Sequence, residues 1–340
     1  MRPKHRNMEE FAQASGVSRP TLSKYFDDPA SVRPATRARI EAALRASDYR
    51  PNPFARNLNR KRTKTVGVVV PSIIDPHYSG LVSRIETLCV EAGYWPLVIS
   101  CHGSAELEAR AFDAVLSQKV AGALVAPLGA PANARLAEEL GREVPLVSFD
   151  NVGEADAPFV GNDNRQSVAT IVDYLCRAGE PPAFFDMPAV NRNAAERRAA
   201  YADTMARLGH EPVFLGSREG LSWDFERHGF EEMEKLLTAG RRPPRTILCA
   251  NDRVAFGAMA AAHARGLRIG RGREADLALA GHDDHPLSRY SCPALTTMAQ
   301  DTGAIATRST AMLFALIDGG LDSAERRAIV EARLVMRRSA

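Results

Sequence analysis

The chain has 340 residues, of which 45% are hydrophobic and 25% are charged, a composition typical of a globular protein with two or three domains. Its net charge of +3 hides a basic head, because residues 1–64 contain fifteen Lys and Arg against six Asp and Glu, and the rest of the chain is acidic overall. The chain has no run of eighteen apolar residues, no signal-type stretch in MRPKHRNMEE and no CxxC among its five cysteines, so we expect a cytoplasmic protein with reduced thiols rather than a membrane or secreted one.

The first 48 residues have the pattern of three short helices. Asn7 can cap a helix over residues 8–14, and Gly16 then breaks it. Ser18 can cap the second helix, and a third is expected over residues 34–47. Each carries apolar residues at helical spacing, which can close a small core. Helix, glycine turn and helix are the outline of a helix-turn-helix.

A basic linker, residues 49–64, joins this head to the rest of the chain. Asn52 can cap a helix over residues 54–58, which at about one turn is too short to fold unaided. Ala55 and Leu58 share one face of it, and Arg and Lys crowd the remainder. A small residue beside an exposed Leu, ringed by cations, suits an apolar wedge for the DNA minor groove. An ordinary charged linker is the alternative.

Two motifs of the basic region, in this order, resemble those of the LacI family of bacterial transcription regulators. MEEFAQASGVSRPTLSKYFDD resembles the family's N-terminal signature, a helix followed by AGVS, two variable residues and TVSRVLN. YRPNPFARNL resembles the family's YRPNxxAxxL hinge. The resemblance implies a helix-turn-helix head and a hinge helix that bind double-stranded DNA.

Residue roles follow from the position of each residue in the motif. The second helix of a helix-turn-helix places its N-terminal residues at base edges in the major groove, so Arg19 is the best candidate for reading guanine, while Pro20 offers an apolar contact. By the resemblance, Lys24 also helps to choose the operator and Leu58 enters the central base step. The alternatives are a capping role for Ser18 and a solvated charge for Lys24. The expected DNA contacts are Asn7, Ser18, Arg19, Pro20, Thr21, Ser23, Lys24, Asn52, Ala55 and Leu58.

The body, residues 65–340, alternates apolar β-branched runs with helical patterns. Buried strands separated by helices indicate parallel sheets covered on both faces. The strands are too many for one small sheet, and residues 159–164 and 295–298 resemble short crossings. We therefore expect two α/β lobes around a cleft, the first made of residues 65–162 with 299–325 and the second of residues 163–294 with 326–340. The resemblance implies a periplasmic-binding-protein-like core. Strands are expected over residues 65–71, 97–100, 122–126, 146–149, 183–185, 246–249 and 277–280.

Polar residues follow most of these runs. Ligands bind beyond the carboxyl ends of parallel strands, so these residues are candidates for a ligand site. Carboxylates, amides and one Arg suit vicinal hydroxyls, and Trp223, Tyr78 or Phe149 could stack on a sugar ring. The expected effector site consists of Asp75, Tyr78, Asp150, Asn164, Arg197, Trp223, Asn251, Asp252 and Asp283.

Family motifs recur at several of these positions. DPHY resembles NPFF, RRAAY resembles RxxGY, NDRVAFGA resembles NDxMAxGA, and GHDD resembles GFDD. The resemblance implies that the matching residues hold an effector, above all Arg197, Asn251, Asp252 and Asp283. Asp75, His77, Ala200 and His282 depart from the motifs, which leaves the ligand's identity open. Trp223 falls near a family aromatic but one residue out of register.

The residues of the body also allow a metal site, an enzyme or a free binding protein to be considered. The run from His282 to His285 has no further ligand at metal spacing, and acid–base chemistry by Asp283 with Arg197 is not favoured. No GxGxxG follows a strand, and Gly266, Gly270 and Gly272 lie in a basic turn, which disfavours an NAD enzyme. A free periplasmic binding protein would carry no basic head. Asp252 could simply cap a helix over residues 253–264. We expect no enzyme, no metal and no cofactor.

The resemblance therefore implies a DNA-binding repressor, a homodimer on a pseudo-palindromic operator. A small effector, a sugar or polyol, would control it from the cleft, and a purine corepressor is the alternative. The last residues contain no heptad pattern, so a tetramer is not expected.

Overall fold

A computed structural model describes residues 5–49, 63–153, 156–239, 243–322 and 325–340. The chain forms two compact units, Met1–Thr63 and Lys64–Ala340. Asn52, Ala55 and Leu58, the expected hinge contacts, lie outside the described residues.

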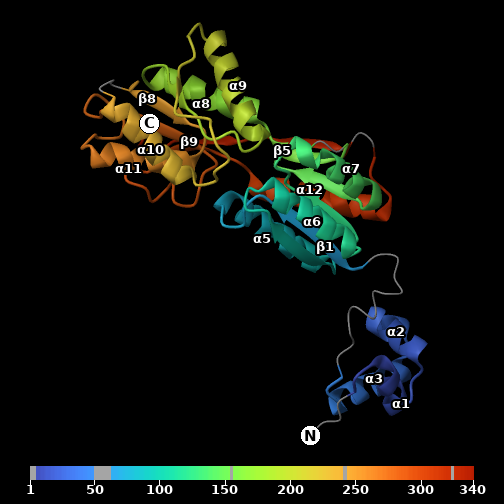
Figure 1. Ribbon diagram of the computed structural model, residues 1–340. Coiled ribbons are helices and arrows are strands. Elements are labelled where there is room, and N and C mark those ends of the chain that lie inside the picture. The colour runs from blue at the N-terminus through green and yellow to red at the C-terminus, as the bar shows by residue number, and fades with distance from the viewer. Residues whose placement is uncertain (1–4, 50–62, 154–155, 240–242, 323–324) are drawn as a thin grey trace. The chain divides into compact units, whose positions relative to one another are not determined.

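The head is a bundle of three helices (Figure 1). The Asn7 side chain accepts a hydrogen bond from the backbone N–H of Glu10, and Gly16 ends the first helix with φ +62, as the sequence predicts. Phe11, Leu22 and Ile40, one from each helix, are fully buried in its core. The helices are α1 (Met8–Ser15), α2 (Arg19–Asp27) and α3 (Pro34–Ala46), with a 3-10 turn η1 (Pro29–Ser31) before α3.

The described residues of the body form two six-stranded sheets, one in each lobe. The first has the order β11-β5-β4-β3-β1-β2 and the second the order β12-β10-β9-β8-β6-β7. All pairs are parallel except β12 with β10. The strands of the first sheet are β1 (Thr65–Val70), β2 (Trp95–Ser100), β3 (Gly122–Val125), β4 (Leu146–Phe149), β5 (Phe159–Asn162) and β11 (Arg327–Val330). Those of the second are β6 (Ala183–Phe185), β7 (Phe214–Leu215), β8 (Thr246–Cys249), β9 (Ala278–His282), β10 (Thr296–Ala299) and β12 (Arg333–Val335).

Helices cover both faces of each sheet. In the first lobe Val66, Val68 and Val70 of β1 pack toward α5 (Pro76–Glu91) and α12 (Thr302–Asp318), whereas Val69 packs on the other side. That side is covered by α6 (Ala105–Ser117) and α7 (Ala134–Glu143), which follows a 3-10 turn η2 (Pro131–Asn133). In the second lobe α8 (Asn164–Ala178) packs on α9 (Arg192–Arg207), and α10 (Phe225–Thr238) packs on α11 (Asp252–Ala264) (Figure 1). The predicted architecture of two α/β lobes is thus confirmed.

In the described residues the chain passes between the lobes after β5, after β10 and between β11 and β12. Two details differ from the predictions. Residues 159–164 and 295–298 are not only crossings, because β5 and β10 are paired strands of the two sheets. Residues 327–330, expected in the second lobe, belong to the first because β11 pairs with β5.

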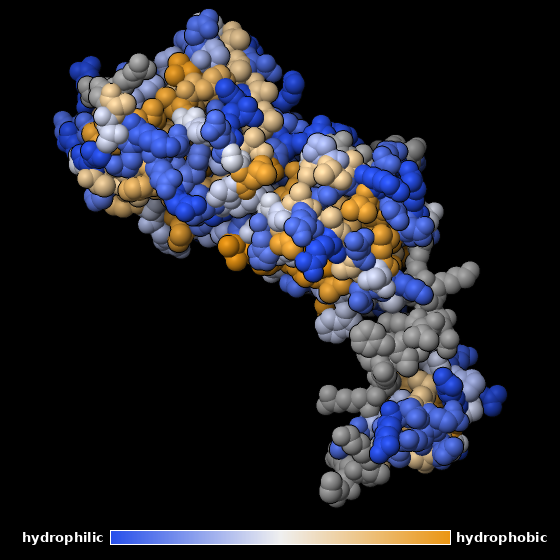
Figure 2. Space-filling model, viewed as in Figure 1, coloured by the Kyte–Doolittle hydropathy of each residue, from blue (hydrophilic) through white to orange (hydrophobic). Residues whose placement is uncertain are grey.

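The surface of the body is largely hydrophilic on the face seen in Figure 2, and its hydrophobic residues lie in scattered patches. Isolated exposed apolar residues are normal for a globular protein. Among the described residues, no helix combines the length and apolarity needed to cross a membrane.

Candidate functional site

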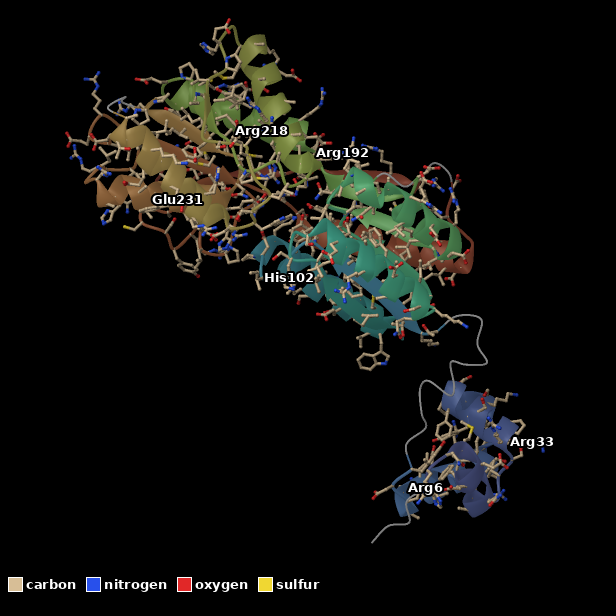
Figure 3. All side chains as sticks on the ribbon, viewed as in Figure 1. Arg6, Arg33, His102, Arg192, Arg218 and Glu231 are labelled. Atoms are coloured by element: carbon tan, nitrogen blue, oxygen red, sulfur yellow. The ribbon has the colours of Figure 1, made fainter. Side chains whose placement is uncertain are left out.

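The DNA-reading candidates of the head lie on the exposed side of α2. Arg19, Pro20 and Lys24 are exposed, whereas Leu22 and Tyr25 face the core. Ser18 stands at the N-cap position, but its hydroxyl lies 2.8 Å from Thr21 Oγ1 and makes no capping bond, which differs from the capping prediction. Arg6 and Arg33 add cations to the head (Figure 3).

Asp150, directly after β4, collects hydrogen bonds from both lobes. His77 Nε2 lies 2.8 Å from its Oδ1, and the Tyr78 hydroxyl donates to its Oδ2 over 2.8 Å. From the second lobe, Asn193 Nδ2 donates to the same Oδ2 over 3.3 Å. Asn151 Nδ2 also donates to it, and Asn151 Oδ1 accepts from the backbone N–H of Asn193. One buried carboxylate therefore joins the first lobe to α9 of the second.

In the second lobe, Arg197 of α9 is the centre of a similar set of polar contacts. It is buried, and its three guanidinium nitrogens each have a partner: Nε donates to Asn164 Oδ1 over 3.2 Å, Nη1 to the carbonyl of Ala250 over 2.9 Å, and Nη2 lies 3.0 Å from Asp283 Oδ1. The same Asp283 oxygen accepts from Gln300 Nε2, which lies at a crossing between the lobes. Arg197 thus fixes the end of β9 relative to α8.

A second polar link between the lobes runs through Asp75, the N-cap residue of α5. Its Oδ1 accepts from the backbone N–H of His77, and its Oδ2 lies 3.0 Å from Arg253 Nη1 of α11. Arg253 also forms a two-bond pair with Glu226. The Asp75 carboxylate therefore both caps a helix and holds the two lobes together.

Apolar contacts between the lobes centre on Trp223. Its ring lies 6.0 Å from that of Tyr78, and it packs against the cores of both lobes. It also contacts Gly103, whose φ of +70 and lack of Cβ leave room for the indole. Near the same junction Arg192, at the start of α9, packs against Gly129 (Figure 3).

His77 carries a proton at neutral pH. Burial alone would lower the pKa of His77, but Asp150, helped by Asp283 and Asp75, raises it to about 9. Nε2 therefore donates to Asp150. The other ring nitrogen, Nδ1, is buried and has no hydrogen-bond partner in the described part of the chain. A donor without an acceptor is thus built into the cleft wall.

At the end of β9, His282 is neutral and Asp283 is ionised. Burial opposes ionisation of Asp283, yet Arg197 holds the pKa of Asp283 well below its usual range. Burial, helped by Arg197, lowers the pKa of His282 to about 4. Neutral His282 therefore donates from Nδ1 to the Asp283 carboxylate over 2.9 Å, while its Nε2 lies 2.9 Å from Ser167 Oγ.

The cleft is nearly filled by these side chains. The cavity beside Asp150 and Arg197 has a volume of about 30 Å³, against roughly 300 Å³ for a small ligand site. A neighbouring cavity of about 290 Å³ shares Asp75, His77 and Asp283 with it and is also lined by both lobes. A ligand larger than water must displace bonds that link the lobes in order to reach the inner cavity.

Six expected effector residues come together in the lining of the inner cavity: Asp75, Tyr78, Asp150, Arg197, Asn251 and Asp283. Asn164 lies behind them, bonded to Arg197, and Trp223 packs on Tyr78. Phe149, a candidate for ring stacking in the sequence, is instead fully buried in the first core.

Asp252 does not line the inner cavity, although it lines the neighbouring one. Its carboxylate accepts hydrogen bonds from Ser288 Oγ, Thr297 Oγ1 and the backbone N–H of His285, all within the second lobe. Burial and the nearby Asp283 raise the pKa of Asp252 to about 7. The expectation that Asp252 caps α11 is wrong, because Asn251 has the extended cap conformation and accepts from the backbone N–H of Val254.

Sequence reasoning left several cleft residues out of the expected site. His77, Asn191 and Asn193 all line the inner cavity and follow strand ends, so the strand-end signal that selected the expected site applies to them as well. Met187 and Phe225 line it too, but apolar residues carry no such signal. In the described residues, no group of three His, Cys, Asp or Glu is placed to hold a metal ion.

Comparison with known proteins gives matches over most of the chain. Residues 7–52 match the model of bacterial regulatory proteins of the lacI family, and residues 174–340 match a periplasmic binding protein-like domain. The transcriptional regulator PtxS of Pseudomonas aeruginosa PAO1 is 31% identical over 98% of this chain and 95% of its own length. The transcriptional repressor CytR of Escherichia coli K12 is 28% identical over 92% and 90%.

Among solved structures, the Lac repressor dimer bound to operator and the anti-inducer ONPF superimposes with a TM-score of 0.85. The two chains are 26% identical, and the match covers 98% of each. The similarity therefore extends through both the head and the two lobes.

The ionised His77 gives a test of the cleft by pH. A histidine whose pKa is higher when folded adds stability that is complete below its unfolded pKa of about 6.5 and is lost as pH rises through about 9. We expect the wild type to have a higher free energy of unfolding than His77→Gln. The difference should be largest near pH 6 and should shrink by pH 10. Chemical denaturation of both proteins across this range measures it. A difference that does not change with pH would contradict the ion pair.

Proposed function

This chain belongs to the LacI family of bacterial regulatory proteins, and we propose that it represses carbohydrate-related genes under the control of a neutral sugar-like effector. It is a DNA-binding transcriptional regulator with a helix-turn-helix head and an effector-binding body. In this proposal it acts in the cytoplasm as a homodimer on a pseudo-palindromic operator and catalyses no reaction.

The charges and hydrogen-bond donors of the cleft support a neutral effector. Asp75, Asp150 and Asp283 place three carboxylates around it, while each guanidinium nitrogen of Arg197 already has a partner. These carboxylates already pair with His77, Arg197 and Arg253, so a phosphate or carboxylate would have to compete with them for a cation. A hydroxyl can donate to a carboxylate and accept from His77 Nδ1, which lacks a partner in the described residues.

Aromatic geometry favours the same class over a purine corepressor. The Tyr78 hydroxyl is bonded to Asp150, and its ring is already packed by Trp223. A flat purine would have to separate these two rings before it could stack. A polyol needs only to exchange hydrogen bonds with side chains that already face the cavity.

The proposed mechanism couples the cleft to the hinge. Entry of an effector breaks the Asp150–Asn193 and Asp75–Arg253 links, so the ligand favours one arrangement of the lobes over another. A change in lobe arrangement alters the spacing of the two hinge segments across a dimer, and with it operator affinity.

Arg19 tests the DNA-reading surface. Replacing it by Ala should weaken binding to the operator by about 1–3 kcal/mol and relax the base preference at one position of each half-site, because a bidentate contact to guanine is lost. Equilibrium binding to the operator and to random DNA at one salt concentration measures both effects. Equal losses on the two DNAs would make Arg19 a phosphate contact.

Arg197 tests the effector site. Arg197→Lys keeps the positive charge beside Asp283 but cannot reach Asn164, the Ala250 carbonyl and Asp283 together, so effector binding should weaken by tenfold or more, about 1.4 kcal/mol, with operator binding retained.

Arg198→Lys is the matched control for this test. Arg198 is the next residue of α9, pairs with the buried Asp186 at 3.3 Å and does not line the inner cavity. Calorimetric titration and operator binding with and without effector compare the two variants. A normal response from Arg197→Lys, or an equal loss from Arg198→Lys, would remove Arg197 from the site.

A further inference from the structure

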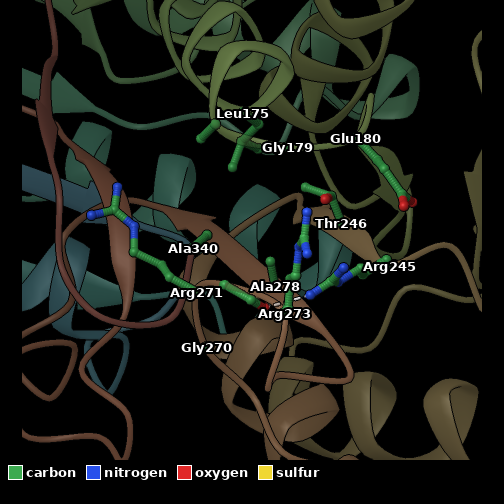
Figure 4. A pocket seen from close by; sticks show the side chains of 12 residues that line it. Leu175, Gly179, Glu180, Arg245, Thr246, Gly270, Arg271, Arg273, Ala278 and Ala340 are labelled. Carbon is green, nitrogen blue, oxygen red and sulfur yellow. Dashed lines mark hydrogen bonds between the residues drawn. The ribbon is translucent and has the colours of Figure 1, made fainter.

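The basic turn noted in the sequence, residues 266–273, has no part in the cleft, yet it borders a second cavity (Figure 4). This cavity has a volume of about 420 Å³, within the range of roughly 300–1,000 Å³ that holds small molecules. Thr246 and Ala278 line it, and they begin β8 and β9. It therefore lies at the amino ends of these strands, whereas the cleft lies at their carboxyl ends.

The cavity wall is unusually rich in arginine. Arg245, Arg271 and Arg273 line it, and the only carboxylate side chain among its described lining residues is that of Glu180. In the described part of the chain, none of the three arginines forms an ion pair with a carboxylate within 4 Å, although Arg271 lies 5.5 Å from the centre of the Tyr174 ring. Three arginines against Glu180 and the main-chain carboxylate of Ala340, the last residue of the sequence, leave a net positive charge around the cavity.

The turn that carries two of these arginines is held in place by its own contacts. Arg245 Nη2 donates to the carbonyls of Gly272 and Ala275. The backbone N–H of Arg268 donates to Asp276 over 2.8 Å, and an isolated bridge joins residues 269 and 277. The turn is thus ordered before any ligand arrives, which lowers the entropy lost on binding.

The remaining wall suits the carbon skeleton of a small molecule. Leu175, Ala178 and Ala278 supply apolar contact beside the arginines. One carboxylate oxygen of Ala340, the last residue of the sequence, accepts from the Tyr174 and Thr296 hydroxyls. The cavity therefore offers cationic donors beside apolar surface.

We propose that this arginine pocket, lined by Arg245, Arg271 and Arg273, is a second ligand site that binds a small organic anion through a phosphate or carboxylate group. The planar guanidinium matches both oxyanions by paired N–H donors, and the apolar wall receives the rest of the molecule. In the cleft, by contrast, three carboxylates already pair with His77, Arg197 and Arg253, which disfavours the same anions. The chain thus carries two sites of opposite charge preference, and the second does not depend on the function proposed for the first.

Thermal unfolding of the full chain at constant ionic strength tests this proposal. Inorganic phosphate, glucose 6-phosphate and citrate are compared with chloride, so that phosphate and carboxylate chemistry are read separately. At saturation at least one oxyanion should raise the midpoint by about 5 °C beyond chloride. Arg271→Ala and Arg273→Ala should each weaken that anion's binding about tenfold, because each removes a charge-assisted hydrogen-bond donor. Both side chains are exposed, so neither change should prevent folding.

Two controls make the result decisive. Arg110→Ala removes an exposed arginine of α6 in the other lobe and should leave the shift unchanged. Arg197→Lys alters the cleft and should also leave it unchanged, whatever it does to a sugar. The proposal is wrong if no oxyanion exceeds chloride, if Arg271→Ala and Arg273→Ala shift like the wild type, or if only Arg197→Lys abolishes the effect.

Discussion

The arrangement of the body depends on one buried carboxylate. Asp150 sits at φ +62 directly after β4 and accepts from His77 and Tyr78 of its own lobe and from Asn193 of the other. Removing one partner of a buried charge costs several kcal/mol, so the closed cleft persists only while these donors stay together. A ligand that supplies equivalent donors can take their place. These hydrogen bonds to Asp150 hold the lobes together. In the proposed function, a polyhydroxyl ligand replaces them and so changes the arrangement of the lobes.

The position of the site follows from strand direction and from helix capping. Parallel strands end at one edge of each sheet, and the helices that follow begin there with unpaired N–H groups. Asp75, Asp163, Asn191, Asn251 and Asp301 each cap a helix of the body by accepting from its first turn. Three of these, Asp75, Asn191 and Asn251, also line the inner cavity. Capping thus holds ligand-facing side chains on rigid elements, and it does so at the edge where the two lobes meet.

Local sequence patterns predicted most helices and strands. They could not predict features that depend on contacts between residues distant in sequence. Apolar runs located the strands from β1 to β4, β6, β8 and β9, but β11 and β12 are short and partly exposed, so only their pairing with β5 and β10 defines them. Strand-end position found Asp75, Asp150, Arg197 and Asp283. It could not separate neighbours such as Asn251 and Asp252, since one faces the cavity and the other is turned toward Ser288 and Thr297. Arg253 was missed because its partner Asp75 is distant in sequence and in the other lobe.

In the proposed function, the cleft takes a neutral polyhydroxyl ligand. Thermal unfolding of the full chain against neutral sugars and polyols, with purine bases and nucleosides as the competing class, tests it most directly. One neutral sugar or polyol should stabilise the wild type, by about 2.7 kcal/mol at a hundredfold excess over its dissociation constant. Asp150→Asn should lose this effect. Stabilisation by purines alone, or an undiminished sugar effect in Asp150→Asn, would contradict it.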